Sequence, residues 1–208
     1  MTTADDVMPI IDLARFVNGT ARERRRIAAR VDEVCRGSGF LIITGHRVPE
    51  STLESAWQAA ADFFDLPLIE KMRYAATEPS EPRGYFPMER ETLSRSRDVD
   101  TPPDLKEAFS CGRLTSSEGN DKTGFFHGPN IWPSRPIGFR RDWETYYQAM
   151  ERLSDEIMSL FAVALGLPDS YFRPYFNCHA SALRALNYPP PDRGAKPLQQ
   201  RAGAHSDY

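Results

Sequence analysis

The stretch ALRALNYPPPDRGAKPLQQRAGAHSDY, residues 182–208, contains the pattern on which the fold prediction depends. Residues 183–188, LRALNY, are typical of a strand, and residues 201–208, RAGAHSDY, of a second strand. A loop rich in Pro and Gly separates them. The chain is therefore expected to enter a β-rich region here, and to end soon after entering it.

The second of these strands carries a candidate metal site. In an extended strand successive side chains point to opposite faces, so His205 and Asp207 would share one face and could both reach a single ion. The spacing alone is weak evidence, because a surface histidine beside a turn aspartate gives the same pattern by chance. A pair of ligands is in any case an incomplete set.

The front of the chain alternates strands with helices. Residues 8–13, MPIIDL, predict a short strand. In the next segment Thr20 and Glu23 have the spacing of a capping box, and Gly37 would end the helix. The apolar stripe of this helix is expected to contain Ile27, Val31, Val34 and Cys35. Residues 39–45, GFLIITG, form an unbroken apolar run between glycines and predict a buried strand.

A second helix is expected after Pro49. Ser51 and Glu54 repeat the capping-box spacing, and Pro67 would end the helix, with a short helical turn over residues 68–73. The side chains predicted to share one face are Leu53, Trp57, Ala60 and Phe64.

From residue 77 to about residue 135 the composition shifts to Pro, Ser, Gly and charged residues, which predicts long loops. Interspersed aromatic side chains indicate that these loops are packed: Tyr85, Phe86, Phe109, Phe125, Phe126 and Trp132.

Residues 136–166 give the strongest helical signal. Pro136 suits the start of a helix and Gly166 its end. Apolar residues recur there at steps of four and three: Phe139, Trp143, Tyr146, Met150, Leu153, Ile157, Leu160 and Ala164. A coiled coil is the alternative, but the bulky aromatics and the single occurrence of the stripe favour a core helix under a sheet.

Composition excludes several classes of protein. The net charge of -3 argues against a nucleic-acid binder, and the basic run at residues 22–26 is interpreted as a solvated helix face. Cys35, Cys111 and Cys178 form neither a disulfide framework nor a zinc motif. The sequence shows neither a signal peptide nor an apolar run of membrane-spanning length, so we expect a cytoplasmic protein. Nothing in it indicates an oligomeric state.

Eight segments and the long helix ending in ALGLP (164–168), taken together and in order, resemble the isopenicillin N synthase-like family of non-haem Fe(II) and 2-oxoglutarate-dependent oxygenases. The eight segments are MPIIDL (8–13), GFLIITGHRVP (39–49), FFDLPLIEK (63–71), RGYFP (83–87), DLKEAFSCG (104–112), NIWPSRPIGFR (130–140), LRALNYPPP (183–191) and GAHSDY (203–208).

The resemblance implies an α+β fold, in which a helix and strand region with a long core helix leads into an incomplete double-stranded β-helix, or jelly roll. Residues 1–135 would be the N-terminal non-haem dioxygenase region with its long loops. Residues 136–180 would be the long core helix and a short turn, and residues 181–208 the first strands of the truncated β-helix.

The resemblance also implies a site. His205 and Asp207 match the first two Fe(II) ligands, and Tyr188 matches the tyrosine near the carboxylate of the cosubstrate 2-oxoglutarate. A strand residue packing on its neighbour is an equal alternative for Tyr188. With O2 as the second cosubstrate, such a site hydroxylates, desaturates or cyclises a small molecule. The family's third ligand, a histidine, and its arginine for 2-oxoglutarate would both lie beyond Tyr208.

The remaining histidines, His46, His127 and His179, are interpreted as structural or surface residues, because all of them precede the His-x-Asp pair. Arg83, Arg90 and Arg97 could favour an anionic substrate, but exposed loop arginines are the commoner explanation.

Two functions therefore compete. The first is an Fe(II)/2-oxoglutarate oxygenase acting on a small molecule, with this 208-residue chain alone inactive. The second is a non-catalytic, oxygenase-like fragment that binds a partner through its open sheet edge.

Overall fold

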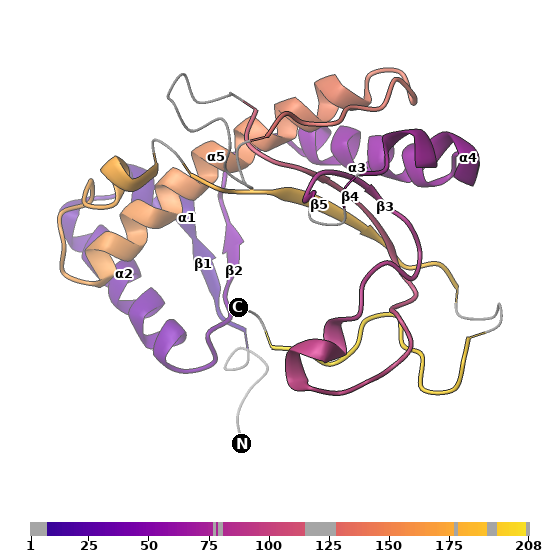
Figure 1. The fold of residues 1–208 in the computed structure, drawn as a ribbon. Coiled ribbons are helices and arrows are strands. Elements are labelled where there is room, and N and C mark those ends of the chain that lie inside the picture. Colours follow the sequence, from indigo (N-terminus) through magenta and orange to yellow (C-terminus); the bar gives the residue numbers. More distant parts are fainter. Residues whose placement is uncertain are drawn as a thin grey trace. The chain divides into compact units, whose positions relative to one another are not determined.

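The computed structural model describes residues 8–76, 78, 81–114, 128–176, 179–190 and 195–206. The chain divides into two compact units, one made of residues 1–54 and 145–179 and the other of residues 55–144 and 180–208. Helices and strands are mixed in both, as the sequence predicts (Figure 1).

The first unit contains a small parallel sheet, two helices between its strands, and most of the long helix that carries Leu160. Strand β1 (Ile10–Asp12) pairs with β2 (Ile42–Thr44), and helices α1 (Leu13–Asn18) and α2 (Ala21–Arg36) lie between them in the chain. The core of this unit is formed by Ile11, Leu13, Phe16, Ala28, Val31 and Leu160. The predicted order of strand, helix, strand and helix is confirmed.

Helix α2 begins and ends where its capping residues predict. The Thr20 hydroxyl accepts the Glu23 backbone N–H at 3.3 Å, and the Glu23 carboxylate accepts the Thr20 N–H at 2.8 Å, which completes the capping box. The Gly37 N–H closes the last turn on the Glu33 and Val34 carbonyls. Cys35 is exposed, because the buried stripe runs through Ala28, Val31 and Val34.

Residues 39–45 contain the predicted strand, but the prediction that this strand is buried is wrong. Strand β2 has three residues, and side chains alternate across its two faces. Ile43 packs against the core, whereas Ile42 is 42% exposed and Phe40, just before the strand, 69% exposed. The two-stranded sheet is therefore covered on one face.

The second unit is built on a three-stranded antiparallel sheet, in the order β3 (Gly84–Phe86), β4 (Glu107–Cys111), β5 (Leu183–Asn187). The central strand β4 is buried at all five positions. The region predicted to be loops thus supplies two of the three strands, and also the 3-10 helix η3 (Leu93–Arg97). The predicted strand at residues 183–188 is confirmed as β5.

Aromatic rings fill the core of this unit. Phe63 lies 5.0 Å from Phe109 and 5.8 Å from Tyr85, centroid to centroid, and both pairs meet edge to face. Trp143 stacks on Phe139 at 4.8 Å and meets Phe109 edge to face at 5.2 Å. Such pairs add stability beyond their buried area. Tyr85 and Phe109 are therefore packed, as predicted, whereas Phe125 and Phe126 lie outside the described residues.

Helix α3 (Glu50–Phe64) differs from its prediction in start and orientation. It begins one residue before Ser51, which places Ser51 inside the first turn instead of at the cap. Its buried side chains are Ala56, Ala59 and Phe63, and Trp57 is 79% exposed. The short turn predicted after Pro67 is confirmed as α4 (Leu68–Lys71) and the 3-10 helix η2 (Met72–Tyr74).

The long helix α5 (Phe139–Ala164) is confirmed, and it ends in a Schellman motif at Gly166, whose φ is 72°. The Gly166 N–H bonds to the Val163 carbonyl and the Leu167 N–H to the Ala162 carbonyl. Of the predicted stripe, Phe139, Trp143 and Leu160 are buried and the other members are half-buried. Three further side chains of the helix are buried: Tyr147, Ala149 and Ala162. A 3-10 helix, η4 (Arg173–Phe176), follows. No helix in the described ranges combines the length and apolarity needed to cross a membrane.

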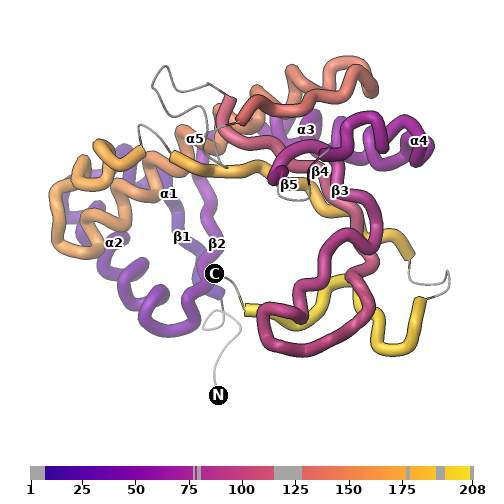
Figure 2. The backbone as a smooth tube through the Cα atoms, in the orientation of Figure 1, coloured from indigo at the N-terminus to yellow at the C-terminus, as the bar shows by residue number. Residues whose placement is uncertain are grey.

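The second strand predicted near the terminus is not formed over residues 201–206, which take no ladder partner. Their backbone N–H groups bond to side chains instead, at Gly203 and at Ser206. Figure 2 shows this segment running beside the loop that precedes β4.

Candidate metal centre

The segment carrying His205 lies against residues 89–105 of the same unit. The Leu105 N–H donates to the Gln200 carbonyl at 2.8 Å. The Ser206 N–H donates to the Ser96 hydroxyl at 3.1 Å. The chain on both sides of His205 is thereby attached to one loop.

Glu89 holds the beginning of this segment. Its carboxylate accepts the Gln199 side-chain amide at 2.9 Å and the Lys196 ammonium at 3.0 Å. Both hydrogen bonds lower the pKa of Glu89 below its usual range, and the bond from Gln199 has the larger effect. The attachment is therefore present while Glu89 is ionised and weakens as the pH falls through that lowered pKa.

Asp104 lies at the centre of the contact, with 1% of its surface exposed. One carboxylate oxygen accepts the Gly203 N–H at 2.9 Å, and the other accepts the Leu93 N–H at 3.0 Å. The Lys106 ammonium lies 3.5 Å from the second oxygen. A carboxylate buried this deeply needs such partners to stay charged.

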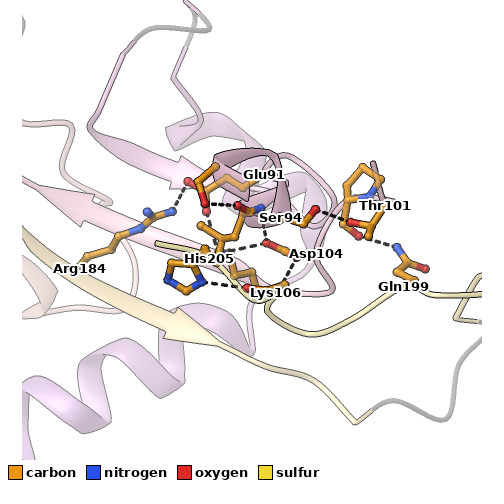
Figure 3. Close-up of polar contacts among 12 residues, drawn as sticks. Glu91, Ser94, Thr101, Asp104, Lys106, Arg184, Gln199 and His205 are labelled. Carbon is orange, nitrogen blue, oxygen red and sulfur yellow. Dashed lines mark hydrogen bonds and ion pairs between the residues drawn. The ribbon is translucent and has the colours of Figure 1, made fainter. Parts of the chain in front are cut away.

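A chain of charges joins Asp104 to strand β5, as Figure 3 shows. Lys106, itself buried, lies 3.3 Å from the Glu91 carboxylate. Arg184 of β5 donates to the same carboxylate at 2.6 Å. Positive and negative groups alternate along the chain, so its four charges balance.

The His205 ring is oriented by a backbone carbonyl. Its Nδ1 lies 2.8 Å from the Gly203 carbonyl oxygen. A carbonyl can only accept, so Nδ1 is the donor in this contact. Metal-binding histidines commonly donate their other ring N–H to a backbone carbonyl in this way. The geometry of His205 therefore fits an iron ligand.

Asp207 and His127 lie outside the described residues, so the pairing of His205 with Asp207 stays a prediction. Within the described ranges, no group of three or more His, Cys, Asp and Glu residues is placed to hold a metal ion. His46 and His179 serve local contacts: the Val48 N–H donates to His46 Nδ1 at 3.1 Å, and His179 lies 2.9 Å from Glu151.

Tyr188 directly follows β5 and is half-buried. The Arg201 guanidinium lies 5.4 Å from the centroid of the Tyr188 ring. It also donates a hydrogen bond to the backbone carbonyl of Tyr188 at 2.5 Å. In the part of the chain that the structure describes, the Tyr188 hydroxyl makes no hydrogen bond. A phenol so placed has its proton available for an acceptor such as a carboxylate.

Buried polar groups also hold the end of β5 just before Tyr188. Asn187 donates to one oxygen of Glu107 at 2.8 Å, and Lys71 donates to the other at the same distance. The Tyr85 hydroxyl donates to Glu107 as well. Burial is the larger cause, and the hydrogen bond to Glu107 the next, of a raised pKa of the Tyr85 hydroxyl. The hydroxyl therefore stays protonated and donates this hydrogen bond.

The loop arginines differ from one another. Arg97 is exposed, but Arg83 is 2% exposed and lies 3.4 Å from Glu81, so the interpretation of Arg83 as an exposed loop residue is wrong. Arg90 lies over the Phe86 ring, 4.6 Å from its centroid. Arg83 and Arg90 thus have structural contacts of their own.

Comparison with known families decides the membership of this chain. Residues 8–135 match the family model described as the non-haem dioxygenase in morphine synthesis N-terminal region. The chain belongs to the Fe(II)/2-oxoglutarate-dependent oxygenase family. It is 32% identical over 210 residues to a 2-oxoglutarate-Fe(II) type oxidoreductase of Emericella nidulans, covering 96% of this chain and 58% of the relative.

Other relatives agree. A clavatol oxidase of Penicillium crustosum is 32% identical over 218 residues, covering 97% of this chain and 64% of that one. A 2OG-Fe(II) oxygenase family protein from Caulobacter crescentus superposes with a TM-score of 0.79 at 26% identity, covering 99% and 62%. A Neurospora crassa protein solved with α-ketoglutarate and thymine gives 0.77 at 26%, covering 100% and 64%. The chain thus spans about three-fifths of the length of each of these relatives.

The buried charged residues near the start of β4 were missed by sequence reasoning. The stretch DLKEAF, residues 104–109, contains three charged residues at or just before the start of a fully buried strand: Asp104, Lys106 and Glu107. Charged residues are seldom buried unless they are paired. That density of charge beside an apolar strand was a usable signal, although it did not identify Gly203 as the partner.

Proposed function

We propose that this chain forms part of an oxygenase active site that binds Fe(II), 2-oxoglutarate and O2 and acts on a small molecule. The observation that carries the proposal is the His205 ring, which the Gly203 carbonyl orients through Nδ1 at 2.8 Å, as backbone carbonyls orient metal-binding histidines. Family membership and the relatives' names support the choice of Fe(II) and 2-oxoglutarate.

In the proposed site His205 and Asp207 are the iron ligands that this chain supplies, and Tyr188 donates a hydrogen bond to the 2-oxoglutarate carboxylate. The iron, when bound with its cosubstrates, supplies the oxidation of an unactivated C–H bond. The way the protein orients the substrate would decide between hydroxylation, desaturation and ring closure.

We further propose that the third protein ligand and the arginine for 2-oxoglutarate come from sequence outside these 208 residues. The described residues contain no group of three potential ligands, and the chain spans 58% of its Emericella nidulans relative. Residues 181–208 would then begin the double-stranded β-helix, and the 208-residue chain alone would be inactive. We place this enzyme in the cytoplasm, where the free thiols of Cys35 and Cys111 stay reduced.

The test is an anaerobic titration with Fe(II) and 2-oxoglutarate, following the visible absorption of the iron-chelated cosubstrate, on this chain and on a version extended to the length of its relatives. We expect the band in the extended protein and its loss in His205→Ala and Asp207→Ala. The second candidate, a non-catalytic interaction module, predicts no band in either protein.

A further inference from the structure

We propose that Asp104 is the positioning residue of the metal centre, fixing where His205 presents its Nε2 atom. The inference rests on the proposed function, because it assigns a role in that same site to a residue that touches neither iron nor substrate.

The first argument is that Asp104 holds the chain immediately before His205. Its carboxylate accepts the Gly203 N–H, and the Gly203 carbonyl in turn accepts the His205 Nδ1–H. Both bonds use the same glycine, so a movement of Gly203 would move the acceptor of the His205 ring. Asp104 therefore acts on His205 through one residue.

The second argument is that Asp104 also fixes the other anchor of His205. Its second oxygen accepts the Leu93 N–H, which opens the 3-10 helix η3, and η3 carries Ser96. The Ser96 hydroxyl accepts the Ser206 N–H. One buried carboxylate thus organises the contacts on both sides of His205.

The third argument is that Asp104 has little freedom to move. It is 1% exposed, with one oxygen committed to Gly203 and the other to Leu93 and Lys106. Gly203 is also packed tightly, since a Cβ there would lie 3.1 Å from the Ser94 nitrogen. A support of this rigidity is what an iron ligand on a strand-free segment requires.

These partners also indicate that Asp104 is not itself a metal ligand. Both of its oxygens are already used by backbone N–H groups, and the Lys106 ammonium would compete with a cation. Its role is to hold Gly203, as supporting residues hold the ligands of other metal sites.

The test compares Asp104→Ala and Asp104→Asn with the parent in the protein extended to the length of its relatives. Metal affinity is measured with Co(II) alone, by its visible absorption. The His205 tautomer is measured without metal by 15N NMR of labelled histidine, at a pH where the ring is neutral. Asp104→Ala is expected to weaken Co(II) binding by about 10- to 100-fold. Its His205 ring is expected to lose the Nδ1–H tautomer that the parent shows.

Glu89→Gln is the matched control, because Glu89 holds the same segment at its other end, through Lys196 and Gln199. It should leave the His205 tautomer unchanged and Co(II) affinity within about twofold of the parent. If Asp104→Ala does not fold, Asp104→Asn carries the test, because its single carbonyl oxygen can satisfy Gly203 or Leu93 but not both.

A folded Asp104 variant with the parent's Co(II) affinity and the parent's His205 tautomer would overturn the inference. The proposed function fails separately, if the parent and His205→Ala bind Co(II) equally. In that case the His205 tautomer still decides whether Asp104 positions the ring.

Discussion

The Lys71 ammonium lies 2.8 Å from the Glu107 carboxylate, and the two side chains are 9% and 7% exposed. Tyr85 and Asn187 donate to the same carboxylate. The ion pair thus lies between the short helix α4 and the central strand β4, and it also holds the end of β5. A buried pair of this kind is costly to break, because the partner left behind is an unpaired charge in a place without water.

Replacing Lys71 by Met should therefore lower the free energy of unfolding by about 3–5 kcal/mol, because it leaves Glu107 charged and buried. Urea unfolding followed by circular dichroism measures the change. Glu33→Gln, which breaks the exposed pair with Arg30, is the control and should cost about 0.5 kcal/mol or less. A loss of similar size in both variants would contradict the argument that breaking the buried pair costs more than breaking the exposed one.

Thr20→Ala should destabilise the protein by about 1 kcal/mol, because it removes the hydroxyl that accepts the N–H at the start of α2. Ser51→Ala has the same sequence context, with a glutamate three residues on, but Ser51 lies inside the first turn of α3. Its cost should be within about 0.5 kcal/mol of zero. Thermal unfolding of both variants decides the matter, and equal costs would contradict the assigned helix starts.

The buried thiol of Cys111 predicts a loss of stability at high pH. Burial raises the pKa of Cys111 to about 12 from its ordinary value. The folded thiol thus stays protonated where the unfolded thiol has ionised. Its contribution is intact below about pH 9 and falls by up to about 1.4 kcal/mol per pH unit between there and the raised pKa. Urea unfolding across this range should show a shallower fall in Cys111→Ala.

Cys35 provides the contrast in reactivity, because it is exposed. In a Cys178→Ser background, one thiol should react quickly with a thiol reagent and the second only after unfolding. Two fast thiols in the folded protein would contradict the burial of Cys111.

Sequence reasoning located the elements that carry strong local signals. The α2 capping box and the α5 stripe with its terminal glycine were predicted because their determinants lie within a few residues of one another. The same kind of reasoning failed for α3. There the Ser51 and Glu54 spacing was present without the cap, and Trp57 was assigned to a face that tertiary packing leaves exposed.

The strands were harder to predict, because their pairing is not local. Strand β4 stands in a stretch of Pro and charge. It pairs with β3 and β5 on its two sides, and rings distant in sequence cover its Phe109. For the proposed site, the family's motifs point to His205 and Tyr188, and their roles stay predictions. The contact of Asp104 with the His205 segment could not be predicted, since its partner Gly203 lies 99 residues away in sequence.

Tyr188→Phe tests the proposed cosubstrate contact. The change removes the phenolic proton and keeps the ring under the Arg201 guanidinium, so packing should be preserved. Because a hydrogen bond to a charged acceptor contributes about 1.5–3 kcal/mol, 2-oxoglutarate should bind the iron-loaded protein, extended to the length of its relatives, about 10- to 150-fold more weakly. Anaerobic titration of the iron-chelate absorption measures that affinity, and Fe(II) affinity without 2-oxoglutarate should not change. Tyr175→Phe, an exposed tyrosine of the other unit, is the control. Equal 2-oxoglutarate affinity in the two variants would mean that Tyr188 serves strand packing, the alternative that its position after β5 also allows.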